Sequence, residues 1–237
     1  MRNLHKAYYK DYYKNLNFNY LLGIGEEPNA EIKRRNKGFT ASNLLQRIPE
    51  NSLVNKTIEL QIAYPGLVTG IGIGHEASIE GEFKLGLHFD WTYGMPVVYG
   101  SSVKGVLRSY FKEFCDYDNQ VIDDIFEGEG KSIYDRDIFF DAVIIKADWK
   151  DRILCPDSIT PHLQGPLKNP IPITFMKIAP GCVMQFRFKL VETRIHRKDE
   201  KEIVVTPDEK LEIFKTILET VGIGAKTNVG YGQLKSR

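Results

Sequence analysis

Alternating apolar and polar positions mark the segments of this chain that are expected to form half-buried β-strands. In residues 57–64 the apolar positions are Ile58, Leu60, Ile62 and Tyr64. Residues 79–89 alternate in the same way, and residues 95–99 are expected to be the return arm of a hairpin. Residues 138–149 are apolar on both faces, which predicts a central strand, and residues 182–190 predict another long strand.

A helix is predicted where apolar side chains recur at helical spacing, at Val103, Val106, Leu107, Tyr110 and Phe114. A serine at its start, Ser101 or Ser102, is expected to cap it by accepting from exposed amides. Because a helix N-terminus carries partial positive charge, Ser101 and Ser102 with Lys104 and Arg108 form a candidate phosphate site. The alternative is an ordinary capped helix whose basic face is solvated.

The last helix is predicted to begin at a capping box, Thr206 to Glu209, with Pro207 at the first helical position. Gly222 is expected to end this helix, and residues 227–236 are expected to form a final strand. The predicted order is strand, helix, strand, strand, helix, strand. This order indicates an α+β, ferredoxin-like (RRM-like) core with long insertions.

Two segments lie outside that core pattern. Residues 1–56 are polar and read as an N-terminal helical extension, which leaves residues 57–237 for the core domain. Residues 150–181 hold more than half of the prolines of the chain without obvious periodicity. A segment of that length and composition is typical of a functional or partner-bound insertion.

Charge and composition narrow the classes of function. The chain has 237 residues with 32 basic and 31 acidic side chains, so its net charge of +1 argues against a free-standing, charge-driven nucleic-acid binder. Three dispersed cysteines and five histidines without ligand spacing favour neither disulfides, a metal site nor a cofactor. The cysteine usage favours a reducing cytoplasm. The first residues contain no apolar signal-peptide core and no apolar run approaches about 18 residues, which argues against secretion and membrane spanning.

Glycine-rich segments are the second candidate for binding. GIGAKTNVGYG is not a nucleotide-binding loop, because its glycines follow a helix and precede a strand. The amides of this loop, with Gly224, Lys226, Thr227 and Asn228, are expected to follow an RNA backbone without reading bases. The alternative is a tight turn whose glycines serve packing. Tyr231 is expected either to stack on a base or to lie in the core.

Three motifs, in this order, resemble the RAMP proteins of CRISPR systems: YPGLVTGIGIGHEASIEGEFKLGLHFD, PVVYGSSVKGVLRSYF and VGIGAKTNVGYGQL. DIFFDAVII, SITPH and PIPITF add a resemblance to the type III-B (Cmr) members, over about residues 57–235. The resemblance implies a ferredoxin-like core in an RNA-targeting antiviral complex. It implies guide (CRISPR) RNA, target RNA and other Cmr subunits as partners, contact with the 3′ part of the guide RNA, and no nuclease activity.

One enzymatic alternative remains open. In the first glycine-rich segment, Gly74 and His75 are candidate RNA contacts, and His75 is also a candidate general base on a ribose hydroxyl, with Lys104 steadying the phosphate. That reading makes the chain a metal-independent endoribonuclease. An acidic cluster at Asp135, Asp137 and Asp141 suits a metal-dependent nuclease, although a turn followed by an edge residue is the simpler interpretation.

Overall fold

The computed structural model describes residues 3–14, 26–70, 81–83, 87–160, 173–196 and 202–236. These ranges hold helices and strands in the following order: α1 (Leu4–Lys6), η1 (Ala7–Asp11), α2 (Glu26–Phe39), β1 (Lys56–Ile62), β2 (Val97–Val98), α3 (Gly100–Phe114), α4 (Asn119–Phe126), β3 (Ile138–Phe139), β4 (Ala142–Lys146), β5 (Leu154–Ile159), β6 (Ile173–Ile178), β7 (Val183–Lys189), β8 (Thr193–His196), β9 (Glu202–Val205), α5 (Pro207–Val221), η2 (Thr227–Val229) and β10 (Leu234–Lys235).

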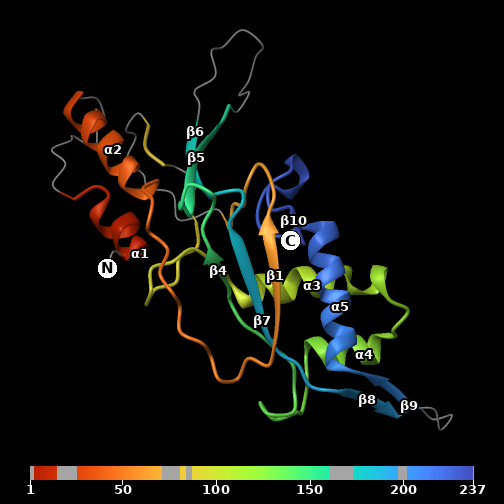
Figure 1. Ribbon diagram of the computed structural model, residues 1–237. Coiled ribbons are helices and arrows are strands. Elements are labelled where there is room, and N and C mark those ends of the chain that lie inside the picture. The colour runs from red at the N-terminus through yellow and green to blue at the C-terminus, as the bar shows by residue number, and fades with distance from the viewer. Residues whose placement is uncertain are drawn as a thin grey trace.

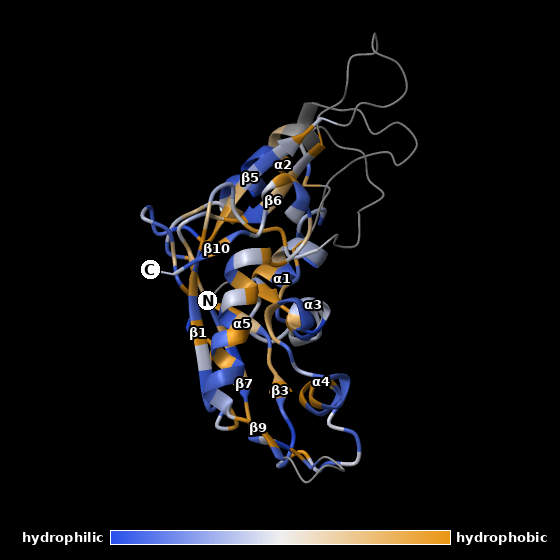
Figure 2. Ribbon diagram, turned by 90° about the vertical axis from the view of Figure 1, so that its right-hand side faces the viewer, coloured by the Kyte–Doolittle hydropathy of each residue, from blue (hydrophilic) through white to orange (hydrophobic). Residues whose placement is uncertain are grey.

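An antiparallel sheet forms the centre of this mixed α/β structure (Figure 1). Its strand order is β10-β1-β7-β4-β2, and β3 pairs with β7 beside β4. Figures 1 and 2 show α3 and α5 on one side of the sheet. Phe214 of α5 meets Phe188 of β7 with ring centroids 5.5 Å apart, and Phe111 of α3 packs on Phe214 at 6.0 Å. These aromatic contacts fix both helices on the sheet.

The alternation in β1 predicted its buried face except at the last position. Ile58, Leu60 and Ile62 are buried, whereas Tyr64 is 85% exposed. The strand ends at Ile62, because Pro65 has no amide to continue the ladder. The expectation that Tyr64 belongs to the buried face is therefore wrong.

The predicted serine cap of α3 is also wrong. The helix begins at Gly100 after Tyr99, with no side-chain cap from within the segment. Instead, the amide of Gly100 donates to the carboxylate of Asp141 at 2.7 Å. A Cβ at Gly100 would lie 2.2 Å from the carbonyl oxygen of Phe139, so only glycine fits there. By contrast, α5 begins with the predicted capping box at Thr206 and Glu209.

Several predicted strands are shorter in the structure. The apolar run at 138–149 is divided into β3 and β4, and a register shift interrupts β4 between Ile144 and Lys146. Of residues 79–89, the described part forms only an isolated bridge between Phe89 and Pro96. The tail holds η2 and the two-residue strand β10. The length and register of a strand therefore depend on the neighbouring strands, which the alternation within one segment does not reveal.

The Pro-rich segment contains two paired strands, β5 and β6, which form a hairpin. Strands β5 and β6 pair antiparallel from Leu154↔Ile178 to Ile159↔Ile173, and residues 161–172 between them lie outside the described part. In Figure 1 this hairpin projects from one end of the central sheet.

The N-terminal helices share the hydrophobic core of the rest of the chain. Tyr8 and Tyr12 are buried, and the hydroxyl of Tyr8 donates to the carbonyl of Phe83 at 3.1 Å. Ile32 and Phe39 of α2 belong to the same cluster. Among the helices within the described ranges, none combines the length and the apolar character needed to cross a bilayer.

Candidate functional site

Residues 222–233, here called the glycine loop, join the end of α5 to β10. The loop is held against residues 66–68 by hydrogen bonds from Ala225 N to Val68 O (2.8 Å) and from Gly232 N to Gly66 O (2.8 Å). At Gly224, φ is +99°, and a Cβ would lie 2.4 Å from Val68 O. The glycines therefore serve the close packing of two backbone segments, as one of the two interpretations of the sequence expected.

The tip of the glycine loop stays available for a ligand. Lys226 has a left-handed backbone (φ 62°) and leads into the short helix η2. Within the part of the chain that the structure describes, the side chains of Lys226, Thr227 and Asn228 form no hydrogen bond or ion pair. The neighbouring Val229 is 63% exposed. The tip therefore offers one cation and two polar side chains to solvent.

Tyr231 is not exposed as a platform for a base. Its side chain is only 8% exposed, its ring lies edge-on against Phe175, and its hydroxyl donates to the carboxylate of Asp157 at 2.8 Å. Lys177 also bonds to Asp157 and lies over the ring of Tyr231, with Nζ 5.4 Å from the centroid. Burial, with the bond to Asp157, raises the pKa of Tyr231 to about 12. Tyr231 therefore anchors the glycine loop to β5 and β6.

Tyr64 is the exposed aromatic residue that the sequence reading missed at this site. It is 85% exposed, and the next residue, Pro65, approaches Gly230 of the glycine loop, where a Cβ would lie 3.8 Å from Pro65 Cδ. The signal was present in the sequence, because a tyrosine followed by proline and glycine is typical of a strand end. The segment that carries this exposed ring therefore borders the glycine loop, which carries Lys226, and exposed rings and cations are common on surfaces that bind single-stranded nucleic acid.

The basic face of α3 is paired within the protein. Lys104 lies 3.6 Å from the carboxylate of Glu127, and Arg108 lies 2.5 Å from Glu127 and 3.9 Å from Asp123. All of these side chains are partly exposed, so the pairs contribute little to stability. They nevertheless reduce the positive charge that this face can offer to a phosphate.

Three of the N-terminal amides of α3 have acceptors within the protein. Gly100 N donates to the carboxylate of Asp141, and the amides of Ser102 and Val103 donate to the carbonyl of Tyr99 at 2.8 and 3.0 Å. Asp141 thus holds the position that a bound anion would take at this helix end. Ser101 is exposed and Ser102 is half-buried, but the structure does not support a phosphate site between them.

The two candidate sites lie at opposite ends of the sheet. The start of α3 lies beside Asp141, whose carbonyl accepts from Arg187, and Arg187 is the β7 partner of Thr57. The glycine loop instead accepts from Ala63, just beyond the other end of β1. Six residues of strand span about 20 Å. Lys104 and Lys226 therefore do not border a single groove.

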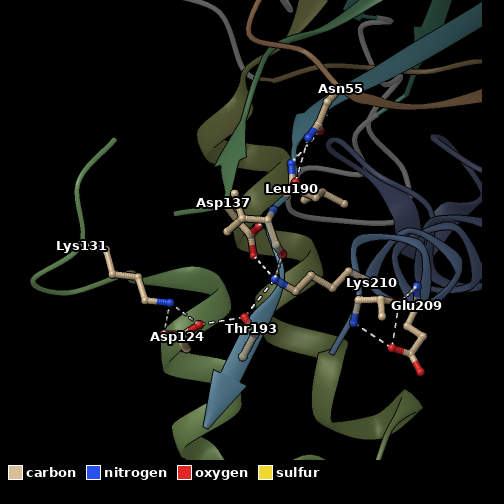
Figure 3. Close-up of polar contacts among 10 residues, drawn as sticks. Asn55, Asp124, Lys131, Asp137, Leu190, Thr193, Glu209 and Lys210 are labelled. Atoms are coloured by element: carbon tan, nitrogen blue, oxygen red, sulfur yellow. Dashed lines mark hydrogen bonds and ion pairs between the residues drawn. The ribbon is translucent and has the colours of Figure 1, made fainter. Parts of the chain in front are cut away.

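The acidic cluster is divided among separate partners. Asp135 accepts from Ser132 at 2.5 Å, Asp141 caps α3, and Asp137 pairs with Lys210 (Figure 3). Among the described residues there is no group of three or more side chains that could hold a metal ion. Gly74 and His75, the remaining predicted site residues, lie outside the described part of the chain.

A sequence model of the RAMP superfamily matches residues 59–235. The chain belongs to the RAMP superfamily. The superfamily expected from the sequence motifs is thereby confirmed. No protein of curated function matches this RAMP chain.

Solved structures that resemble this RAMP protein include proteins of Cmr complexes. A chain in a cryo-EM structure of the type III-B Cmr-beta bound to cognate target RNA is 25% identical, with a TM-score of 0.55, over 76% of this chain and 57% of that chain. The RAMP protein thus spans little more than half the length of that relative. Cmr6 from Pyrococcus furiosus is 21% identical (TM-score 0.38, 77% of this chain and 97% of that chain). Oligomeric Cmr4 from Pyrococcus furiosus is 14% identical (TM-score 0.38, 76% and 95%).

Proposed function

We propose that this RAMP protein is a non-catalytic, RNA-binding structural subunit of a type III-B CRISPR (Cmr) complex, in the position of the sixth Cmr subunit. The observation that carries the proposal is the similarity to a chain of Cmr-beta, whose structure is described as bound to cognate target RNA. The expected partners are the guide RNA, through its 3′ part, the target RNA and neighbouring RAMP subunits. A cytoplasmic location remains part of the proposal.

The strand order supports a ferredoxin-like core for this role. Strands β10, β1, β7 and β4 are neighbours in that order and pair antiparallel throughout. Helix α3 lies between β1 and β4 in the chain, and α5 lies between β7 and β10. This is the strand, helix, strand, strand, helix, strand arrangement of small RNA-binding modules, with added elements.

The glycine loop is the surface that we assign to RNA. Lys226 supplies a charge that no acidic side chain in the described ranges neutralises, Thr227 and Asn228 supply polar groups, and Tyr64 supplies an exposed ring. Contacts of this kind hold the sugar-phosphate backbone and stack on any base, so they bind RNA without selecting its sequence. A subunit that must accept every guide needs this property.

Two matched charge reversals test the proposal in the assembled, co-expressed complex. Lys226→Glu is expected to weaken guide-RNA binding severalfold and to lower the salt dependence of binding by about one unit of slope, since one phosphate contact is lost. Lys104→Glu, the control, is expected to leave RNA binding unchanged because Lys104 already faces Glu127. Unchanged RNA affinity in Lys226→Glu, with native circular dichroism, would overturn the assignment of the loop.

The non-catalytic part of the proposal has its own test. Labelled repeat RNA incubated with the purified chain in EDTA is expected to remain intact. Specific cleavage that disappears in His75→Ala would establish the endoribonuclease instead.

A further inference from the structure

A rigid turn at residues 147–152 follows β4. The carboxylate of Asp148, 1% exposed, accepts from the amides of Lys150 and Arg152 at 2.9 and 2.8 Å and from the guanidinium of Arg152 at 2.8 Å. From outside the turn, the hydroxyl of Ser42 donates to the carbonyl of Lys150 at 2.9 Å. The buried carboxylate thus fixes the backbone on both sides of the residue that the turn displays, Trp149.

Trp149 is held in solvent by this turn. Its side chain is 83% exposed, which is unusual for a residue that is highly buried on average. Lys150 Nζ lies 4.4 Å from the centre of the Trp149 ring, a cation–π contact that keeps the ammonium and the exposed ring together. A tryptophan displayed on a hydrogen-bonded turn costs little entropy to dock, because the backbone is already ordered.

The turn emerges at the same end of the sheet as Tyr64. Lys146, the last residue of β4, and Gln61 of β1 both pair with Val183 of β7. Neighbouring strands lie about 5 Å apart, so β4 and β1 are about 10 Å apart at this level. The turn before β7 contacts both segments. Gly181 N donates to Ile62 O at 2.8 Å, and a Cβ at Gly181 would lie 3.7 Å from Asp148 Cβ.

We infer that Trp149, with Lys146 and Lys150, is a second contact point for single-stranded RNA, which continues the glycine loop and Tyr64 across this end of the sheet. The inference rests on the proposed function and adds to it a stacking residue on a different segment. In the described part of the chain, neither lysine forms an ion pair. Arg152 neutralises Asp148, so Lys146, Lys150 and Asp151 leave a net positive charge around the ring.

This combination favours RNA over a protein partner. Core residues of protein interfaces are depleted in lysine, whereas lysines next to exposed aromatic rings are typical of surfaces that track a nucleic-acid strand. The contact would be indifferent to sequence, since every base has a face that can stack. Recognition of bases by hydrogen bonding is not part of the inference.

Tryptophan fluorescence tests the contact directly. The chain has two tryptophans, Trp91 and Trp149, so the Trp91→Phe variant reports on Trp149 alone. Titration of this variant with oligouridylate is expected to quench its emission with the same midpoint as binding measured by anisotropy. Trp149→Ala is expected to weaken binding by about 5- to 100-fold, and Trp149→Phe by less, as stacking on an aromatic ring implies.

The outcomes separate this inference from the proposed function. If the chain binds oligouridylate and responds to Lys226→Glu but not to Trp149→Ala, with no quenching of Trp149, the second contact point is overturned and the glycine loop stands. If Trp149→Ala abolishes assembly with the other subunits at unchanged RNA affinity, the turn is a protein-docking surface and the inference fails. Absence of RNA binding by both the chain and the complex would overturn the proposed function itself.

Discussion

The ammonium of Lys210 donates to the carboxylate of Asp137 at 2.6 Å, and the two side chains are 0% and 1% exposed (Figure 3). Lys210 also donates to the carbonyl of Val191 and the hydroxyl of Thr193, and Asp137 accepts from the amide of Val191. Every ammonium proton thus has an acceptor. The hydroxyl of Thr193, the first residue of β8, also donates to Asp124 on α4, so one buried network joins α5, α4, Val191 and the start of β8.

Removal of one partner of this pair is expected to be costly. Burial lowers the pKa of Lys210 and raises that of Asp137, because both charged forms are out of water. Lys210→Met leaves the carboxylate unpaired and is expected to lower the free energy of unfolding by about 3–5 kcal/mol. The double variant Lys210→Met with Asp137→Leu is expected to recover most of this loss in urea titrations. A loss below about 1 kcal/mol in Lys210→Met would contradict the buried pair.

Tyr231 and Tyr64 are expected to differ in what their substitution affects. Tyr231→Phe removes the hydrogen bond to Asp157 and is expected to cost about 1.5–3 kcal/mol of stability, the range for bonds to charged groups, with RNA affinity unchanged. Tyr64→Ala is expected to leave stability within about 0.5 kcal/mol and to weaken RNA binding by about 1–3 kcal/mol. Urea titration and anisotropy measure the two effects. A Tyr64→Ala variant with unchanged RNA affinity would contradict the stacking role of Tyr64, and a Tyr231→Phe variant with unchanged stability would contradict the bond to Asp157.

The pH dependence of stability is expected to report on Asp157. Burial acts to raise the pKa of this carboxyl, but the hydrogen bonds from Lys177 and Tyr231 lower it overall. A folded-state pKa below the unfolded value means that the stabilisation is present above the unfolded pKa of about 3.9 and is lost as the pH falls through the folded pKa. Asp157→Asn is therefore expected to flatten the fall of the urea midpoint below about pH 4. An unchanged profile would contradict the role of Asp157.

Local patterns predicted the parts of the fold that depend on neighbours in sequence. The capping box at Thr206, the buried face of β1 as far as Ile62 and the superfamily motifs were all readable in this way. The exposure of Tyr64 was also predictable from its neighbours in sequence, since Pro65 marks the end of the strand.

The candidate site was less predictable because its chemistry depends on distant partners. The sequence predicts a binding surface on the basic face of α3. In the structure, Glu127, which follows α4, pairs with Lys104 and Arg108 on that face. Tyr231 is withdrawn from solvent by Asp157, which lies 74 residues away in the sequence. Alternation and spacing carry no information on such pairs.

The last prediction concerns the start of α3, which is capped by Asp141 and not by the expected serine. Asp141 accepts from the amide of Gly100, and its negative charge lies at the positive end of the helix. Asp141→Ala is therefore expected to lower the free energy of unfolding by about 1–2 kcal/mol, whereas Ser102→Ala, the matched control, is expected to change it by less than about 0.5 kcal/mol. Urea titrations of both variants measure the difference. A larger loss in Ser102→Ala than in Asp141→Ala would restore serine as the cap and free the helix end for an anion.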